Sequence, residues 1–263
     1  MKFSKTAADK EQIKAFLHEK NKNIRIITVR EATSTNDEVK KFAHSEGNEA
    51  VVYIAESQTK GRGRMGRNFY SPESTGIYMS ILLHPELAAQ DCTLLTPLCA
   101  VAVSEAVEKV LSVPCQIKWV NDIYISGRKV AGILTEGAFR KGKIDYTVVG
   151  IGVNISLPQN DFPEDIKSIA GALTKDRTEF KNELIAGIIN EFMYYYELLP
   201  EKIFMQKYKE KLFFLGQEVT VISPEGNYTA TAEDIDDMCR LKIRTGNGEK
   251  KILGSGEISI KIR

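Results

Sequence analysis

The most unusual segment of the chain is a loop that combines three glycines with three arginines. Residues 61–67 read Gly-Arg-Gly-Arg-Met-Gly-Arg. Glycine allows close backbone approach and positive φ, and planar guanidinium groups suit phosphate or carboxylate. The pattern also matches the G-x-G-x-x-G dinucleotide fingerprint, but that fingerprint opens a helix, and here Pro72 follows closely. Spacing leaves two interpretations about equally open, an anion-binding loop between strands and a solvated loop.

Further segments place polar side chains beside expected strands. Residues 34–36 (Ser-Thr-Asn) lie where a strand meets a helix, and capping of that helix is the simpler interpretation. Residues 118–122 (Lys-Trp-Val-Asn-Asp) set the single tryptophan beside a carboxamide and a carboxylate, and Lys129 starts an apolar strand. Residues 150–154 (Gly-Ile-Gly-Val-Asn) indicate the close approach of a ligand or another backbone. Each segment alone also fits an ordinary turn or an edge lysine.

Hydrophobic periodicity predicts the elements that position these segments. Strands are expected at 24–29, 50–55, 76–83, 117–125, 129–136 and 147–155. Helices are expected at 39–47, 98–111 and 180–196, with a shorter one through Leu212. After Leu212, short strands alternate with turns and no helical period is present, which predicts a small β-barrel. The pattern favours an α+β fold over a doubly wound parallel sheet, with one domain at 1–212 and a second at 213–263.

Composition excludes several classes of protein. The 263 residues are 43% hydrophobic and 27% charged, with a net charge of +1, which argues against a basic nucleic-acid-binding surface over the whole chain. The four cysteines show no metal-ligand spacing and are expected to be reduced. No apolar run is long enough for a signal peptide or a membrane span. We therefore expect a cytoplasmic protein without a membrane or nucleic-acid partner.

Together, and in this order, the segments resemble biotin protein ligase (biotin–[acetyl-CoA-carboxylase] ligase). The matching stretches are STND, ESQTKGRGRMGRNFYSP, TGIYMSILL, IKWVNDIYISGRKVAGILTEG, VVGIGVNIS and GSGEISI. The resemblance implies a mixed-sheet catalytic domain of the biotin/lipoate ligase type at 1–212 and an SH3-like barrel at 213–263. Three positions depart from the family's pattern: Met65 stands where many relatives have arginine, Phe69 replaces a common tryptophan, and Val120 replaces a proline.

The resemblance implies a two-step reaction with biotin and ATP as substrates and Mg²⁺ as the metal. The biotin carboxylate would attack the α-phosphate of ATP, giving biotinyl-5′-AMP and pyrophosphate. A lysine amine on the biotin carboxyl carrier protein domain of a biotin-dependent carboxylase would then attack the mixed anhydride. Positioning and charge neutralisation should dominate both steps, without a protein nucleophile.

The resemblance also implies roles for individual residues. Lys129 and Arg64 would be catalytic, and Asp122 would hold Mg²⁺ directly or through water. Biotin would be bound by Ser34, Thr35, Asn36, Gln58, Arg62, Gly63, Arg64 and Lys129. ATP would be bound by Arg62, Arg64, Arg67, Asn121, Asp122 and Asn154.

Three alternatives compete with this interpretation. A lipoate–protein ligase shares the fold, although the complete loop and the KWVND segment favour biotin. A repressor–ligase would carry an N-terminal winged helix, and we expect none because only about 24 residues precede the first strand. A non-catalytic biotin-binding regulator would need neither Lys129 nor the loop arginines. The oligomeric state, monomer or homodimer, stays open.

Overall fold

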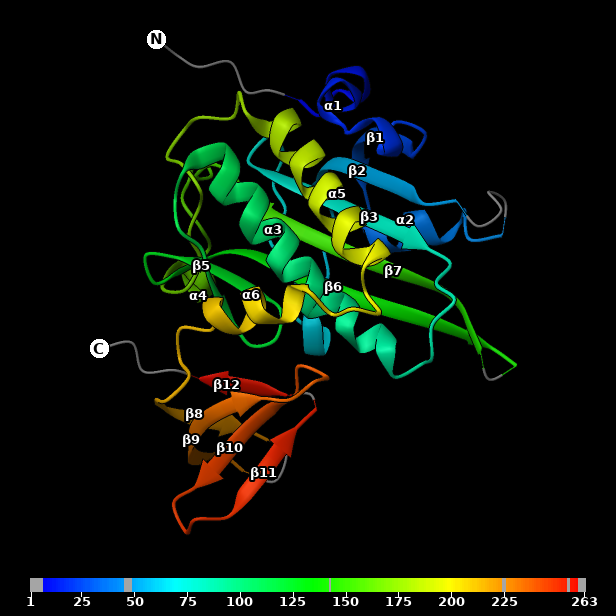
Figure 1. The fold of residues 1–263 in the computed structure, drawn as a ribbon. Helices are drawn as coiled ribbons and strands as arrows, with labels where there is room; N and C mark the ends of the chain where they lie inside the picture. Colours follow the sequence, from blue (N-terminus) through cyan, green and yellow to red (C-terminus); the bar gives the residue numbers. More distant parts are fainter. Residues whose placement is uncertain (1–6, 45–48, 142, 224–225, 255, 260–263) are drawn as a thin grey trace.

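The computed structural model describes residues 7–44, 49–141, 143–223, 226–254 and 256–259, which form two β-sheets with helices packed on the larger one (Figure 1). The strands of the larger sheet are β1 (Arg25–Ala32), β2 (Val51–Gln58), β3 (Gly76–Leu83), β4 (Gln116–Lys118), β5 (Asp122–Ile125), β6 (Arg128–Arg140) and β7 (Lys143–Asn154). Their order across the sheet is β1-β2-β3-β7-β6-β5-β4. Only β1 and β2 pair in parallel, so the sheet is mixed.

The helices divide between the two faces of this sheet. They are α1 (Lys10–Phe16), α2 (Thr35–Lys40), α3 (Leu95–Leu111), α4 (Glu164–Lys167), α5 (Lys181–Glu197) and α6 (Phe204–Lys211). The long helices α3 and α5 lie side by side across one face, because each presents a continuous apolar stripe to the other and to the sheet (Figure 1). The short α2 packs on the opposite face, over β2, β3 and β7. This opposite face is otherwise covered by loops, and these loops form the site described below.

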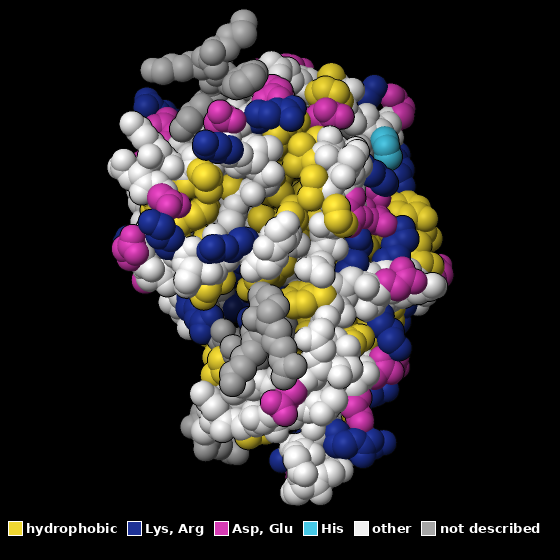
Figure 2. Space-filling view, turned by 90° about the vertical axis from the view of Figure 1, so that its left-hand side faces the viewer, with side chains coloured by type: hydrophobic (Ala, Val, Ile, Leu, Met, Phe, Trp, Pro, Cys, Tyr) yellow, Lys and Arg dark blue, Asp and Glu magenta, His cyan; other side chains and the backbone are white. Residues whose placement is uncertain are grey.

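The smaller sheet follows α6 and is entirely antiparallel. Its strands are β8 (Glu218–Ile222), β9 (Tyr228–Ile235), β10 (Leu241–Thr245), β11 (Lys250–Leu253) and β12 (Glu257–Ser259), in the order β11-β10-β9-β8-β12. The predicted α+β fold, with a mixed sheet followed by a small all-β unit, is confirmed. The space-filling view shows the larger part stacked above the smaller one, with both signs of charge spread over the visible face (Figure 2). None of the described helices combines the length and the apolar character needed to cross a membrane.

The two sheets share one buried core, so the division at 212/213 stays a prediction about domains. Phe214 is fully buried and belongs to the same cluster of packed apolar side chains as α3 and α5. The Trp119 indole N–H donates to the Cys239 carbonyl at 2.9 Å, across the junction between the sheets. Cys239 lies in the turn between β9 and β10, which the Asp236 carboxylate closes by accepting from the backbone N–H groups of Met238 and Arg240.

Three local predictions need correction. The strand expected at 117–125 is instead a hairpin, in which β4 and β5 pair with each other around the turn 119–121. The helix expected at 39–47 is instead α2, which begins at Thr35 and ends at Lys40. Turns follow it to residue 44, and the expected end at Gly47 lies outside the described residues. Helix α1 was not predicted, because its apolar spacing (Ile13, Phe16 and then Leu17) extends over little more than one turn.

Polar side chains of α5 hold the N-terminal segment in place. The Asn182 side chain accepts from the Asp9 N–H, and the Asn190 side chain accepts from the His18 N–H, both at 3.0 Å. Lys181 is 1% exposed, and its Nζ lies 2.7 Å from Glu56 Oε2, while Glu56 Oε1 accepts from the Ala8 N–H. Burial lowers the pKa of Lys181, and the Glu56 carboxylate acts in the opposite direction.

Candidate active site

One pocket collects all the residues for which the sequence predicted a role. It lies between the helix-poor face of the larger sheet and the loops 61–71 and 156–171, with a volume of about 220 Å³. The predicted residues that line it are Ser34, Thr35, Asn36, Gln58, Arg62, Gly63, Arg64, Arg67, Asn121, Asp122, Lys129 and Asn154. Segments that are distant in the sequence therefore meet at one place, while their individual roles stay predictions.

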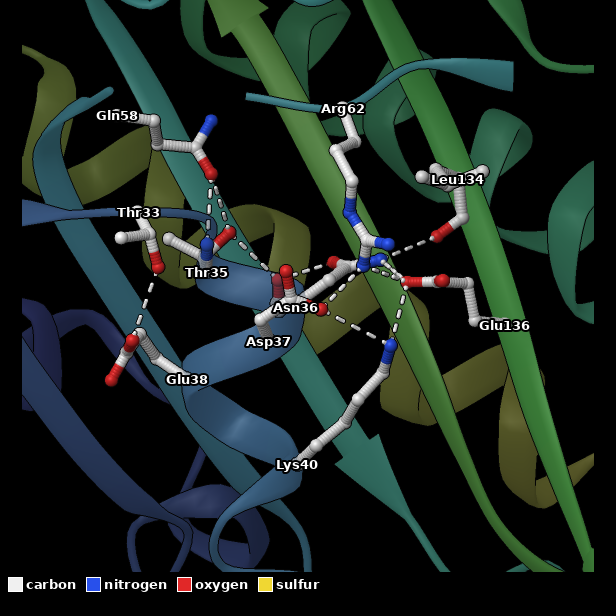
Figure 3. Close-up of polar contacts among 11 residues, drawn as sticks. Thr33, Thr35, Asn36, Asp37, Glu38, Lys40, Gln58, Arg62, Leu134 and Glu136 are labelled. Atoms are coloured by element: carbon white, nitrogen blue, oxygen red, sulfur yellow. Dashed lines mark hydrogen bonds and ion pairs between the residues drawn. The ribbon is translucent and has the colours of Figure 1, made fainter. Parts of the chain in front are cut away.

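One end of the pocket is a network of uncharged hydrogen-bonding groups (Figure 3). The Gln58 side-chain oxygen accepts from the Thr35 N–H at 2.8 Å, and its amide donates to Ser71 Oγ at 2.9 Å. The hydroxyl of Ser80, a residue with no exposed surface, donates to Asn36 Oδ1 at 2.6 Å and lies 2.8 Å from Thr35 Oγ1. A polar end held in this way offers donors and acceptors in fixed directions to a neutral polar ligand.

Helix α2 brings this network into the pocket without the predicted side-chain cap. Ser34 occupies the N-cap position, but its side chain makes no capping hydrogen bond and lines the pocket instead. Glu38, in the first turn of α2, accepts from Thr33 Oγ1 at 3.2 Å and pairs with Lys41. The hydroxyl and amide groups of residues 34–36 are therefore directed to the site rather than to the helix end.

Glycines in β6 and β7 make room on the pocket floor. Gly132 and Gly152 are paired across the two strands. A Cβ at Gly152 would lie 2.5 Å from the Phe69 ring, and a Cβ at Gly150 would lie 2.2 Å from Asn36 Oδ1. The two glycines of 150–154 predicted that a ligand or another backbone lies close to this strand. Side chains lie there instead, and one of them, Phe69, follows the glycine–arginine loop.

Replacing Gly150 with alanine is expected to lower the free energy of unfolding by about 1–3 kcal/mol, because the new methyl group must displace the buried Asn36 amide. Gly137→Ala is the matched control on β6, where a Cβ would meet only the Phe139 ring at 3.6 Å. Urea denaturation of both variants measures the difference. Equal unfolding free energies for the two variants would show that Asn36 can move without cost.

The other end of the pocket is charged. Lys129 Nζ lies 2.6 Å from Asp122 Oδ1, and both side chains are partly buried. The Arg64 guanidinium donates to Asn121 Oδ1 at 3.0 Å, and the Asn121 amide donates to the Ile133 carbonyl at 3.0 Å. The Asn154 amide donates to the Gly171 carbonyl at 2.9 Å, which ties β7 to the loop 156–171. Two cationic side chains thus face the same space as the polar end.

The turn that carries Asn121 and Asp122 is supported from behind. The Tyr208 hydroxyl of α6 donates to the Val120 carbonyl at 3.0 Å, and the Trp119 indole reaches the β9–β10 turn as described above. Burial raises the pKa of Tyr208 well above its usual value, so the hydroxyl remains a donor. Gly256, which directly precedes β12, also lines the pocket. The C-terminal unit therefore helps to shape the charged end.

The glycine–arginine loop forms a small hairpin with one 3-10 turn at Arg64–Gly66, and the next element is β3 and not an α-helix, as the rejection of the dinucleotide fingerprint predicted. The Gly63 N–H donates to the Arg67 carbonyl at 2.7 Å, and the Phe69 N–H donates to the Gly61 carbonyl at 2.9 Å. Met65, one of the departures from the family's pattern, adopts a φ of 55° at the tip with its side chain mostly exposed. Arg62 points back to the polar end and contacts Asp37 Oδ1 at 2.7 Å and Glu136 Oε2 at 2.8 Å.

The site includes residues that the sequence did not single out. Ser80 and Glu136 contact the predicted polar residues, and both were hidden inside expected strands. Phe162, Ile166 and Ile169 close the pocket from a segment that includes α4 and has no recognisable motif. The sequence around the two strand residues could have indicated only that a strand was present, because the residues that each one contacts depend on the order of the strands in the sheet.

Comparisons with known proteins agree with this site and fold. Residues 28–154 match the model of the biotin/lipoate A/B protein ligase family, and residues 214–261 match that of the biotin protein ligase C terminal domain. The chain is 33% identical over 230 residues to the bifunctional ligase/repressor BirA of Bacillus subtilis, covering 84% of this chain and 69% of that protein. It is 28% identical over 238 residues to the biotin–[acetyl-CoA-carboxylase] ligase of Mycobacterium tuberculosis, covering 88% and 86%.

A solved structure is similar over nearly its whole length. It is described as the biotin protein ligase from Aquifex aeolicus in complex with biotin and ATP, and it is 33% identical to this chain. The similarity has a TM-score of 0.71 and covers 89% of this chain and 97% of that one.

Proposed function

The chain belongs to the biotin protein ligase family, and from this premise we propose that it activates biotin with ATP and transfers the biotinyl group to a carrier protein. The expected acceptor is one lysine in the biotin carboxyl carrier protein domain of a biotin-dependent carboxylase. The chain is a ligase enzyme, and we propose that its own residues carry out the reaction in two steps.

The observation that carries the proposal is a single pocket with a neutral polar end and a cationic end, joined by an apolar floor. Biotin has the matching order of groups: a ureido ring that donates and accepts hydrogen bonds, an apolar ring and chain, and a carboxylate. Thr35, Asn36 and Gln58 would bind the ureido ring, with Ser34 beside them. Gly132, Ile133 and Leu134 would face the apolar part, and the carboxylate would lie near Lys129 and Arg64.

In the first step, a biotin carboxylate oxygen forms a bond to the α-phosphorus of ATP while the bond to pyrophosphate breaks. Two anions must approach each other, so a preorganised cation lowers the barrier. Lys129 would supply that charge, since its stem lies against Gly132 and its backbone is fixed by hydrogen bonds with Ile169 and Gly171. The Arg64 guanidinium, held by Asn121, would add further N–H donors to the phosphate.

In the second step, the neutral amine of the carrier lysine attacks the carbonyl carbon of biotinyl-5′-AMP. The C–O bond to AMP breaks, and the attacking nitrogen loses a proton. No histidine or cysteine occurs among the described residues that line the pocket, which is consistent with direct transfer between the bound groups. The role of the site is then to hold the anhydride and to neutralise the departing phosphate.

Asp122 stays the proposed carboxylate for Mg²⁺, directly or through water, but it belongs to no larger cluster of metal ligands in the described part of the chain. Its carboxylate is paired with Lys129, and the described residues contain no group of three His, Cys, Asp or Glu side chains that could hold a metal ion. A divalent cation binds readily to nucleotide phosphates and retains several waters. We therefore propose that Mg²⁺ enters as part of MgATP, and we assign no step to a protein-bound metal.

The proposal is tested by incubating the chain with biotin, MgATP and a biotin carrier domain, then measuring the intact mass of the carrier. One added biotinyl group is expected. A carrier whose acceptor lysine is replaced by arginine is the control for the site of attachment, and omission of ATP is the control for activation. Lipoate in place of biotin tests the alternative substrate. An unchanged carrier mass with biotin, or modification with lipoate alone, would contradict the proposal.

A further inference from the structure

Four charged side chains form a cluster beside the neutral polar end of the pocket, where the glycine–arginine loop meets α2 and β6 (Figure 3). Arg62 Nη2 contacts Asp37 Oδ1 at 2.7 Å and Glu136 Oε2 at 2.8 Å. Lys40 Nζ lies 3.2 Å from Glu136 Oε2 and 3.4 Å from Asp37 Oδ1. Two cations and two carboxylates balance, so Arg62 is already neutralised by the protein.

This pairing gives Arg62 a structural role in addition to its predicted binding role. The resemblance to the family implied that Arg62 binds biotin and ATP, but its guanidinium bridges two protein carboxylates. An arginine in that position fastens its loop to the sheet more directly than it neutralises a substrate anion. Arg64, two residues further along, contacts no carboxylate among the described residues and donates to an amide oxygen.

Glu136 also controls the orientation of Asn36. The Asn36 amide nitrogen donates to Glu136 Oε2 at 2.7 Å. An ionised carboxylate only accepts hydrogen bonds, so the nitrogen must face Glu136 and Oδ1 must face Ser80 and the pocket. Asn36 is therefore presented to a ligand with its acceptor oxygen.

We propose that Glu136 is a positioning residue that links ligand recognition to closure of the glycine–arginine loop. One carboxylate oxygen contacts both Asn36, at the polar end of the pocket, and Arg62, in the loop. A ligand that binds Asn36 Oδ1 stabilises the arrangement in which Glu136 holds Arg62, and by linkage a held loop strengthens binding of that ligand. The identification of the ligand as biotin rests on the proposed function, whereas the link between Asn36, Glu136 and Arg62 does not.

The first test needs no ligand. Arg62, Arg64 and Arg67 are trypsin sites inside the loop, so loosening of the loop can be followed as the rate of cleavage at 62–67 by mass spectrometry. Glu136→Ala is expected to raise that rate at least about tenfold. Glu197→Ala is the matched control, because Glu197 pairs with Lys20 at 2.6 Å on a different surface, and it should leave the rate unchanged. Glu136→Gln keeps the size of the side chain and should give an intermediate rate.

The second test separates positioning from simple loss of structure. In steady-state biotinylation, Glu136→Ala is expected to raise the KM for biotin at least about tenfold while kcat falls less. Arg62→Ala should loosen the loop with a smaller effect on biotin KM, since Glu136 still orients Asn36. The double variant should be less impaired than the two single effects multiplied, because both act through one contact.

The outcomes distinguish this proposal from the proposed function. Unchanged loop cleavage in Glu136→Ala overturns the link, whatever the enzyme's substrate. Faster cleavage with an unchanged biotin KM also overturns it, because the loop is then anchored by Glu136 without affecting recognition. A wild-type chain that modifies no carrier would refute the proposed function, and the cleavage test would still decide whether Glu136 holds the loop.

Discussion

Lys129→Gln is expected to reduce biotin-dependent ATP–pyrophosphate exchange by at least about a hundredfold while the protein still folds. Removing one preorganised donor from a developing anionic centre typically costs on the order of 10²–10³ in rate, or roughly 2.7–4 kcal/mol. Glutamine retains polarity and most of the length of the side chain, so the loss reports the charge. Transfer from supplied biotinyl-5′-AMP should suffer less, because the two anions have already been joined.

The surroundings of Lys129 make this experiment specific. In the ligand-free protein its ammonium group is paired with Asp122, so the same variant leaves that carboxylate without its partner, and the unfolding midpoint must be measured alongside activity. Lys143→Gln, at the exposed start of β7, is the matched control and should exchange at the wild-type rate. Near-wild-type exchange by Lys129→Gln would make Lys129 an ordinary edge lysine.

Lys181→Ala is expected to produce the largest loss of stability, about 3–5 kcal/mol in the free energy of unfolding. Removing one partner of a buried ion pair leaves the other charge without compensation in a medium of low polarity. Here the remaining charge would be Glu56, whose other carboxylate oxygen holds the Ala8 N–H. The N-terminal segment should therefore detach from α5 as the variant loses stability. Urea denaturation gives the first quantity, and amide exchange at residue 8 gives the second.

A surface pair of similar geometry provides the control for Lys181. Lys20 Nζ lies 2.6 Å from Glu197 Oε2, but the two side chains are 46% and 50% exposed. Lys20→Ala should cost no more than about 1 kcal/mol, because water screens and replaces the interaction. A similar loss for both variants would show that burial of the Lys181–Glu56 pair adds nothing to its importance.

Elements with a strong local signal could be predicted from the sequence. The helices α3 and α5 follow from apolar residues repeated every three or four positions, and β3 follows from an apolar run, interrupted by Ser80, that is buried along its whole length. Where the prediction failed, the cause was tertiary. Helix α1 is held by the Asn182 side chain, about 170 residues away, and the strand expected at 117–125 folds back on itself because Tyr208 and the β9–β10 turn support its middle.

The candidate site could be predicted as far as single motifs allow. Residues such as Lys129 and Asn121 stand in recognisable segments, and the structure brings them to one pocket. Glu136 and Ser80 could not be found in this way, because each looks like an ordinary strand residue. Their importance depends on the order β3-β7-β6, which places them on either side of Asn36. The order of these strands in the sheet cannot be predicted from the separation of the residues along the chain.

The bond between Trp119 and the β9–β10 turn has a consequence for how relatives of this protein can diverge. Its acceptor is a main-chain carbonyl, so the side chain at residue 239 can change freely if the new residue tolerates a φ of 56°, as glycine and asparagine do. The shape of the turn depends instead on the Asp236 carboxylate. In an alignment of relatives, the tryptophan donor would thus be constant while the residue at position 239 varies. A C-terminal unit exchanged between ligases should function when it keeps the geometry of this turn, even if its sequence differs.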